Sequence, residues 1–191
     1  MNLSLREINC VMEHSECLLD EVGVEAMFNR LSTEISACCE QQNPLILCVM
    51  TGAVVAVGML LPRLNFPLEV DYIHATRYQG QLVGEELVWR QLPITSLKNR
   101  TVIIVDDVLD EGVTMAKLQE YCMAEGAKRC YTAVLVDKAI QKEKPIKADF
   151  VGFQAGNDYL FGLGMDYKGY LRNANGLYAC PNNLEELLCR Y

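Results

Sequence analysis

The segment that decides the fold reads Thr101-Val102-Ile103-Ile104-Val105-Asp106-Asp107-Val108-Leu109-Asp110-Glu111-Gly112-Val113-Thr114. Its first five residues are mostly β-branched and apolar, which is typical of a fully buried strand. Two adjacent carboxylates follow where that strand is expected to end, and then come two further acids, a glycine and a hydroxyl. Residues 115–123 have the spacing of an amphipathic helix. The segment therefore predicts a strand, a loop and a helix, with the polar chemistry gathered in the loop.

A turn of this kind is a natural phosphate site, because backbone N–H groups and the positive end of the helix dipole meet there. Four acids beside such a site suggest a ligand with phosphate, ribose hydroxyls and a metal ion. The alternative is a structural turn whose acids only cap the helix, as the dipole favours. A cap explains one or two acids, but not the adjacent Asp106 and Asp107 at the end of a buried strand.

The same segment resembles the 5-phosphoribosyl-1-pyrophosphate (PRPP) signature of type I phosphoribosyltransferases. That signature is an apolar run, two acids, two apolar residues, Asp, a variable residue, Gly, a variable residue and Thr, and every constrained position is filled here. The resemblance implies that Asp106 and Asp107 anchor the ribose hydroxyls directly or through Mg²⁺, and that Asp110 accepts the proton from purine N7. The residues implied to bind the 5-phosphate are Asp110, Glu111, Gly112, Val113 and Thr114.

Length and composition predict one domain. At 191 residues the chain is long enough for one full core and short for two. It has no run of eighteen or more apolar residues, and its start lacks a basic region followed by an apolar run. The nine cysteines are odd in number and show no Cys-x-x-Cys spacing, which favours reduced thiols over a disulfide framework or a zinc site. We therefore expect a cytoplasmic protein without a membrane partner.

The formal net charge of −8 is unfavourable for nucleic-acid binding, which needs a basic patch. It also raises a question about the ligand, because a polyanion would bind beside the protein's own carboxylates. Bound Mg²⁺ is the expected source of positive charge, since this ion prefers hard oxygen ligands and substrate phosphates.

The rest of the chain alternates strand and helix patterns. Helices are expected over residues 24–38, 53–61 and 183–188. Further strands are expected over residues 44–50, 68–75, 131–136, 150–152 and 159–162. Residues 79–89 predict a mobile excursion or an irregular hairpin, and residues 142–148 a charged loop.

This alternation predicts an α/β fold with a mostly parallel central sheet flanked by helices. The resemblance refines it to the type I phosphoribosyltransferase fold, with a core over about residues 40–155 and a small hood subdomain. The hood would combine the N-terminal segment with about residues 156–191. Because ligands of such sheets bind beyond the carboxyl ends of the strands, Thr51, Gly52, the acidic loop and Lys138 should share one rim.

The resemblance extends from about residue 45 to residue 172 and points to the hypoxanthine-guanine branch of the family. Residues 49–53, Val-Met-Thr-Gly-Ala, resemble the loop whose backbone amides hold pyrophosphate, so Thr51 and Gly52 are implied to bind PRPP. The family often has a cis peptide bond there, which would be Met50–Thr51. Arg172 is implied to meet pyrophosphate.

The same resemblance assigns the purine site. Lys138 would hydrogen-bond the purine 6-oxo group, Tyr159 would stack on the base, and the Leu160 backbone would read its edge. Asp166 would contact metal together with Asp106 and Asp107. Arg77 and Tyr78 correspond to the start of a catalytic lid, where relatives commonly have Ser-Tyr. A lid excludes water and suppresses hydrolysis of PRPP.

The resemblance therefore implies a glycosyltransferase of purine salvage, which transfers the phosphoribosyl group of PRPP to hypoxanthine or guanine and forms IMP or GMP. It also implies small-molecule substrates and a homodimer or homotetramer. A xanthine- or guanine-preferring enzyme and a non-catalytic PRPP sensor with the same fold remain alternatives. A P-loop hydrolase does not, because the chain has no Gly-x-x-x-x-Gly-Lys-Ser/Thr run.

Overall fold

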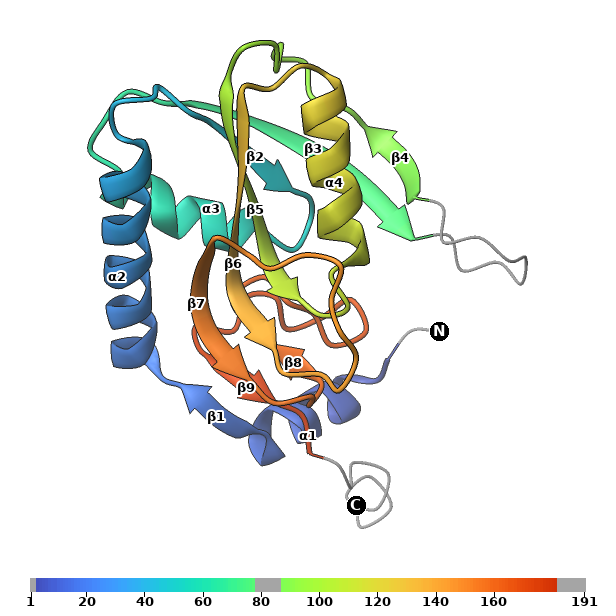
Figure 1. Ribbon diagram of the computed structural model, residues 1–191. Helices are drawn as coiled ribbons and strands as arrows, with labels where there is room; N and C mark the ends of the chain where they lie inside the picture. Colours follow the sequence, from blue (N-terminus) through green and yellow to red (C-terminus); the bar gives the residue numbers. More distant parts are fainter. Residues whose placement is uncertain (1–2, 78–86, 182–191) are drawn as a thin grey trace.

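The computed structural model describes residues 3–77 and 87–181 and contains two sheets (Figure 1). The larger sheet has six strands in the order β4-β3-β2-β5-β6-β7. In this order the strands are Leu87–Gln91, Glu69–Arg77, Leu45–Val49, Thr101–Leu109, Arg129–Lys138 and Phe150–Ala155. All neighbours are parallel except β3 and β4. This confirms the predicted α/β fold with a mostly parallel sheet.

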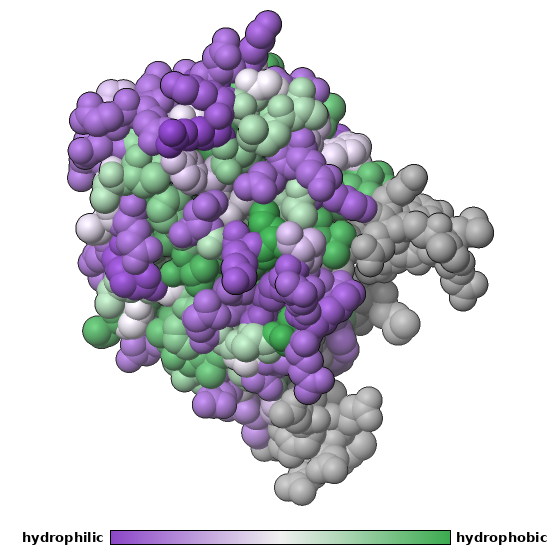
Figure 2. All heavy atoms as spheres, in the orientation of Figure 1, coloured by the Kyte–Doolittle hydropathy of each residue, from purple (hydrophilic) through white to green (hydrophobic). Residues whose placement is uncertain are grey.

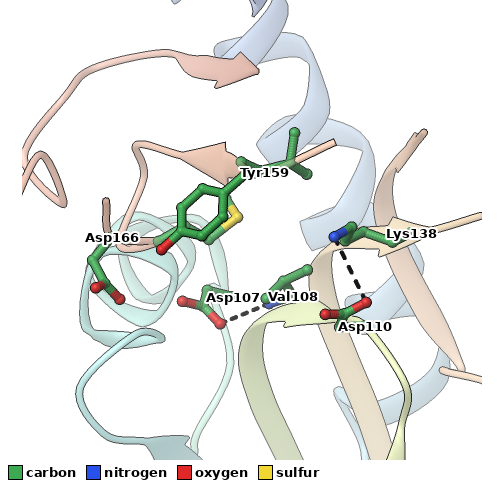
Figure 3. A pocket seen from close by; sticks show the side chains of 8 residues that line it. Asp107, Val108, Asp110, Lys138, Tyr159 and Asp166 are labelled. Atoms are coloured by element: carbon green, nitrogen blue, oxygen red, sulfur yellow. Dashed lines mark hydrogen bonds and ion pairs between the residues drawn. The ribbon is translucent and has the colours of Figure 1, made fainter. Parts of the chain in front are cut away.

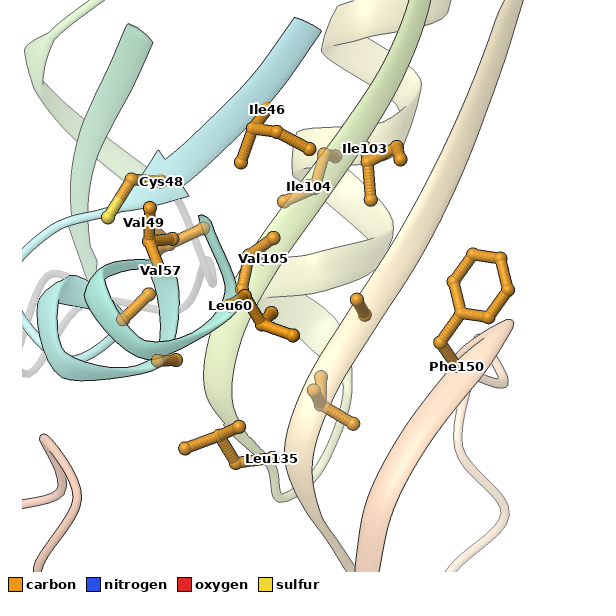
Figure 4. Close-up of a cluster of buried hydrophobic side chains, with 14 of the residues drawn as sticks. Ile46, Cys48, Val49, Val57, Leu60, Ile103, Ile104, Val105, Leu135 and Phe150 are labelled. Carbon is orange, nitrogen blue, oxygen red and sulfur yellow. The ribbon is translucent and has the colours of Figure 1, made fainter. Parts of the chain in front are cut away.

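Helices cover both faces of this sheet. On one face α2 (Glu21–Cys39) packs against β7, while α3 (Val54–Leu60) contacts β2 and β5 and continues into the short 3₁₀ helix η1 (Leu61–Arg63). On the other face α4 (Val113–Ala124) packs on β5 and β6. Because both faces are covered, the apolar runs of the central strands are continuous rather than alternating, and all of β2 is buried. Figure 4 shows Ile103, Ile104 and Leu135 within this core.

We refer to the smaller sheet together with helix α1 (Leu5–His14) as the hood, and it joins segments from the two ends of the described chain. Its order is β1-β9-β8, with β1 (Glu16–Leu19) and β8 (Leu160–Phe161) both antiparallel to β9 (Leu177–Ala179). Helix α1 precedes β1, and these elements lie together beyond the ends of β5, β6 and β7 (Figure 1). The hood therefore faces the carboxyl ends of the central strands.

One boundary differs from the prediction in a way that matters for the site. The central strand was expected to end before Asp106, but β5 continues to Leu109. Its pairing with β6 runs on through Leu109, whereas its pairing with β2 stops at Val105. The two carboxylates thus lie beyond the last residue of β5 that pairs with β2, and the turn after β2 packs against Asp107.

Two expectations fall partly or wholly on undescribed residues. The helix predicted over residues 183–188 lies outside the described ranges, as do residues 79–86 of the predicted excursion. The residues after that gap form β4, which is antiparallel to β3. In the described residues no helix is long and apolar enough to span a membrane. Figure 2 shows hydrophilic residues spread across the visible face, with smaller hydrophobic groups between them.

Candidate active site

A pocket of about 200 Å³ lies where the carboxyl ends of β5 and β6 meet the hood (Figure 3). It brings together residues from three separate parts of the chain. Its lining consists of Asp107, Val108, Asp110, Lys138, Tyr159, Leu160, Met165 and Asp166. Six of these eight were predicted as site residues, and Val108 and Met165 were not. Those two are apolar side chains whose role in lining the pocket depends on the fold rather than on a motif.

Asp106 and Asp107 occupy the part of β5 that β2 no longer covers. The Asp107 N–H donates to Asp106 Oδ1 at 2.9 Å, and the Val108 N–H donates to Asp107 Oδ1 at 2.8 Å. Burial, and then the charge of Asp107, raise the pKa of Asp106 well above its usual value. Burial also raises the pKa of Asp107, although hydrogen bonds from Asp106 and Val108 and the charge of Arg172 oppose this shift. The pair therefore favours a nearby cation.

The turn after β2 touches this pair directly. The Met50–Thr51 peptide bond is cis, as the resemblance implied, and Thr51 is exposed. A Cβ placed on Gly52 would lie 2.1 Å from Asp107 Oδ2, so only glycine permits this approach. The turn predicted to hold pyrophosphate and the strand predicted to hold ribose are thus in contact.

Residues Asp110 to Gly112 form the loop after β5, and α4 begins at Val113, two residues before the expected start, so Val113 and Thr114 lie in the first turn of the helix. Gly112 occupies the N-cap position with φ 79°, a left-handed conformation that favours glycine. Gly112 has no side chain with which to cap the first turn of α4, whereas the side chains of Ser4 and Asp20 cap α1 and α2. A helix end of this kind suits an anion bound by backbone N–H groups.

Lys138 and Asp110 lie side by side on one side of the pocket and form an ion pair (Figure 3). Lys138 is the last residue of β6, and its Nζ lies 3.6 Å from Asp110 Oδ1. The Lys138 side chain is 12% exposed and the Asp110 side chain 50% exposed. The ammonium is therefore largely withdrawn from water, while the carboxylate remains accessible to a ligand.

The hood supplies the opposite wall. Tyr159 is 52% exposed, and its ring packs edge-to-face with that of Tyr167 at a centroid distance of 5.8 Å. Leu160 begins β8 and is buried beside it. An aromatic ring that is exposed to solvent and supported by an edge-to-face contact can stack on a planar ligand.

Asp166 and Arg172, predicted for metal and for pyrophosphate, are paired with each other. Arg172 Nη2 lies 2.6 Å from Asp166 Oδ1, and Arg172 Nη1 donates to the Gly164 carbonyl at 2.6 Å. Asp166 Oδ2 accepts from the Gly169 N–H at 2.6 Å. Asp166 also lines the pocket, so the pair lies beside the space where a ligand would bind. Of the predicted lid residues, Arg77 ends β3 and Tyr78 lies outside the described ranges.

Two adjacent carboxylates are the groups in this site that fit the expected Mg²⁺. The described residues contain no group of three or more His, Cys, Asp or Glu arranged to hold a metal ion. Mg²⁺, however, usually keeps several waters and binds through one or two carboxylates together with substrate phosphates. The Asp106–Asp107 pair supplies such carboxylates, so the site fits an ion that arrives with its substrate rather than a resident one.

Comparison with known proteins shows which family the chain resembles. Residues 14–168 match the family model described as "Phosphoribosyl transferase domain". The chain is 32% identical over 158 residues to a hypoxanthine-guanine-xanthine phosphoribosyltransferase of Tritrichomonas foetus, which covers 82% of this chain and 86% of that protein. It is also 29% identical over 167 residues to a hypoxanthine-guanine phosphoribosyltransferase of Bacillus subtilis (strain 168). That match covers 85% of this chain and 92% of the relative. A solved structure of a hypoxanthine-guanine-xanthine phosphoribosyltransferase superposes with a TM-score of 0.79 at 28% identity, covering 87% of this chain and 97% of that one.

Proposed function

The chain belongs to the phosphoribosyltransferase family, and we propose that it is a purine-salvage enzyme that acts on hypoxanthine and guanine. It transfers the 5-phosphoribosyl group of PRPP to the 6-oxopurine, forms IMP or GMP and releases pyrophosphate. The observation that carries this proposal is the single pocket in which Lys138 and Asp110 face the exposed ring of Tyr159. A cation, a carboxylate and an aromatic face are the three groups that recognition of a 6-oxopurine requires.

In this reaction the substrate PRPP lies along the rim formed by β2 and β5. The loop from Asp110 to Thr114 binds its 5-phosphate through backbone N–H groups at the start of α4. Asp106 and Asp107 bind the ribose hydroxyls, and the turn at Thr51 and Gly52 receives the pyrophosphate. This assignment is supported by the close approach of Gly52 to Asp107, since a Cβ on Gly52 would lie 2.1 Å from Asp107 Oδ2.

The purine lies between Tyr159 and the ends of β5 and β6. Lys138 donates to the 6-oxo group, and the Leu160 backbone reads the purine edge. Asp110 accepts the proton from purine N7 as the new glycosidic bond forms. Proton transfer of this type contributes about 10²–10⁴-fold to the rate. The carboxylates of β5 also stabilise the positive charge that develops on the ribose ring.

Mg²⁺ is the proposed cofactor. Asp106, Asp107 and Asp166 would hold it together with PRPP, and when bound it neutralises the pyrophosphate leaving group. Arg172 adds a second positive charge at that place once it exchanges from Asp166. Asp166 and Arg172 thus move from their mutual contact to the substrate.

The function is tested by incubating the protein with PRPP and Mg²⁺ and, in turn, hypoxanthine, guanine, xanthine and adenine. Nucleotide and pyrophosphate are measured together. We expect equal amounts of both products with hypoxanthine and guanine. PRPP binding without product from any base would instead favour the non-catalytic sensor, and product from xanthine or guanine alone would favour the narrower enzyme.

We further propose that the enzyme works in the cytoplasm as a homodimer or homotetramer and has only small-molecule substrates. The edge of the large sheet supports self-association, because apolar side chains there are exposed on β3, on β4 and in the segment after β4. They are Val70, Tyr72, Val88 and Ile94. Light scattering coupled to size-exclusion chromatography tests the assembly, and a monomer at every concentration would contradict it.

A further inference from the structure

Lys144 makes two short contacts behind the proposed purine site. It lies in the loop between β6 and β7, and its Nζ donates to the Leu109 carbonyl at 2.6 Å and to Asp137 Oδ1 at 2.5 Å. The side chain is only 13% exposed. An ammonium withdrawn from water in this way needs such partners, because an unpaired buried charge is costly. Lys142 and Lys147 in the same loop are exposed.

The two partners of Lys144 stand directly before the two polar residues of the purine pocket. Leu109 precedes Asp110, and Asp137 precedes Lys138. Leu109 and Asp137 are also opposite each other in the pairing of β5 with β6. One ammonium therefore connects the ends of the two strands that carry Asp110 and Lys138. Gln154 Nε2 donates to Asp137 Oδ2 at 3.2 Å, which ties the same carboxylate to β7.

The aliphatic stem of the Lys144 side chain lies near Gly112, whereas its ammonium head contacts Leu109 and Asp137. A Cβ placed on Gly112 would lie 3.5 Å from Lys144 Cβ and 3.3 Å from Ile146 Cγ2. The stem and the residues after it therefore lie behind the loop proposed to bind the 5-phosphate. Removing the charged head while keeping the stem should affect the purine side of the site and spare the phosphate side.

We propose that Lys144 is a positioning residue that sets the spacing of Asp110 and Lys138, and so controls use of the purine rather than binding of PRPP. It touches neither substrate, and it acts through the Leu109 carbonyl and the Asp137 carboxylate. This inference rests on the proposed function, because it assigns Asp110 and Lys138 to the purine.

The test compares Lys144→Met, which keeps the stem and removes the ammonium, with Lys144→Arg and with Lys147→Met as an exposed control in the same loop. Calorimetry gives the Kd of PRPP with Mg²⁺, and initial rates give kcat and KM for hypoxanthine. We expect Lys144→Met to lower kcat/KM for hypoxanthine at least tenfold while its Kd for PRPP stays within threefold of the parent. Lys144→Arg should recover part of the loss, and Lys147→Met should match the parent.

Three results would overturn the inference: parent-like kinetics in Lys144→Met, a parallel loss of PRPP and hypoxanthine binding, or the same loss in Lys147→Met. If Lys144→Met does not fold, Asp137→Asn takes its place, because it keeps the side-chain volume and one acceptor oxygen. It must then show the same purine-selective loss. A parent protein that forms no product from any base would instead refute the proposed function, so the two failures are distinct.

Discussion

Asp106 and Asp107 concentrate negative charge where the fold offers little water. Burial and mutual repulsion raise the pKa of Asp106, so the folded chain holds a proton there more tightly than the unfolded chain does. Such a group contributes stability below its unfolded pKa of about 4, and that contribution is lost as the pH rises through the raised folded pKa. At neutral pH and without metal, the Asp106–Asp107 pair should therefore lower the free energy of unfolding of the protein.

Asp106→Asn should consequently raise the thermal stability of the metal-free protein. The amide keeps an acceptor for the Asp107 N–H and removes the repelled charge. We expect Tm at pH 8 to rise by about 2–4 °C for each kcal/mol of relieved repulsion, with the gain vanishing near pH 4. Differential scanning calorimetry in chelator at several pH values measures this. A variant less stable than the parent at pH 8 would contradict the charge argument.

Asp110 should be separable from its neighbours by kinetics. Asp110→Asn preserves the shape of the side chain and removes the base, so turnover should fall by roughly 10²–10⁴-fold while PRPP binding stays nearly intact. Asp107→Asn, which alters a residue in contact with Gly52, should weaken PRPP binding as well. Pre-steady-state rates together with the Kd of PRPP distinguish the two. If Asp110→Asn turned over like the parent, Asp110 would be only a loop carboxylate.

At the scale of single elements, the turn after β2 needs a glycine at position 52 because of its contact with Asp107, not because of a local turn preference. Gly52→Ala would place its Cβ 2.1 Å from Asp107 Oδ2, so the turn or the carboxylate must move. We expect PRPP affinity to fall at least tenfold and Tm to fall. The matched control is Gly58→Ala in α3, where an added Cβ has no neighbour within 4 Å and should stabilise the helix by about 0.5–1 kcal/mol. Equal effects of the two substitutions would contradict this account.

Elements also show what the sequence could and could not predict. The core of β5 was predictable because Val102 to Val105 are apolar and buried from both faces. Its extension to Leu109 was not, because polar residues look like a strand end and the register with β6 is non-local. Two contacts likewise depend on how loops pack in the folded protein. One is the ion pair of Asp166 with Arg172, and the other is the hydrogen bond from Lys144 to Leu109, which lies 35 positions earlier in the chain. The strand expected over residues 159–162 contains β8, whereas β9, with three residues, is too short for a period to appear.

At the scale of the whole molecule, the hood and the sheet form one site from segments far apart in the chain. Helix α1 joins this arrangement through Glu7 Oε1, which accepts from Tyr167 Oη and from Lys168 Nζ, both at 3.1 Å. Tyr167 in turn supports the Tyr159 ring. Both ends of the described chain therefore help to shape the wall that faces Lys138.

We predict that a polyanionic substrate binds beside Asp106, Asp107 and Asp166 only together with a divalent ion, because the chain has a formal net charge of −8. A chelator should abolish turnover, and added Mg²⁺ should restore it. The Kd of PRPP should weaken in parallel when it is measured without metal. Full activity in metal-free buffer would contradict the proposed charge balance.

The central claim is that this pocket selects a 6-oxopurine through Lys138, and the ratio of kcat/KM for hypoxanthine to that for adenine tests it most directly. A 6-oxo group accepts from the ammonium, whereas the 6-amino group of adenine presents donors and leaves a largely buried charge unpaired, at a cost of more than about 1–3 kcal/mol. We predict that this ratio is at least ten in the parent. In Lys138→Gln the ratio should be smaller, mainly because kcat/KM for hypoxanthine falls. A parent that uses adenine as well as hypoxanthine would contradict both the role of Lys138 and the assignment to 6-oxopurines.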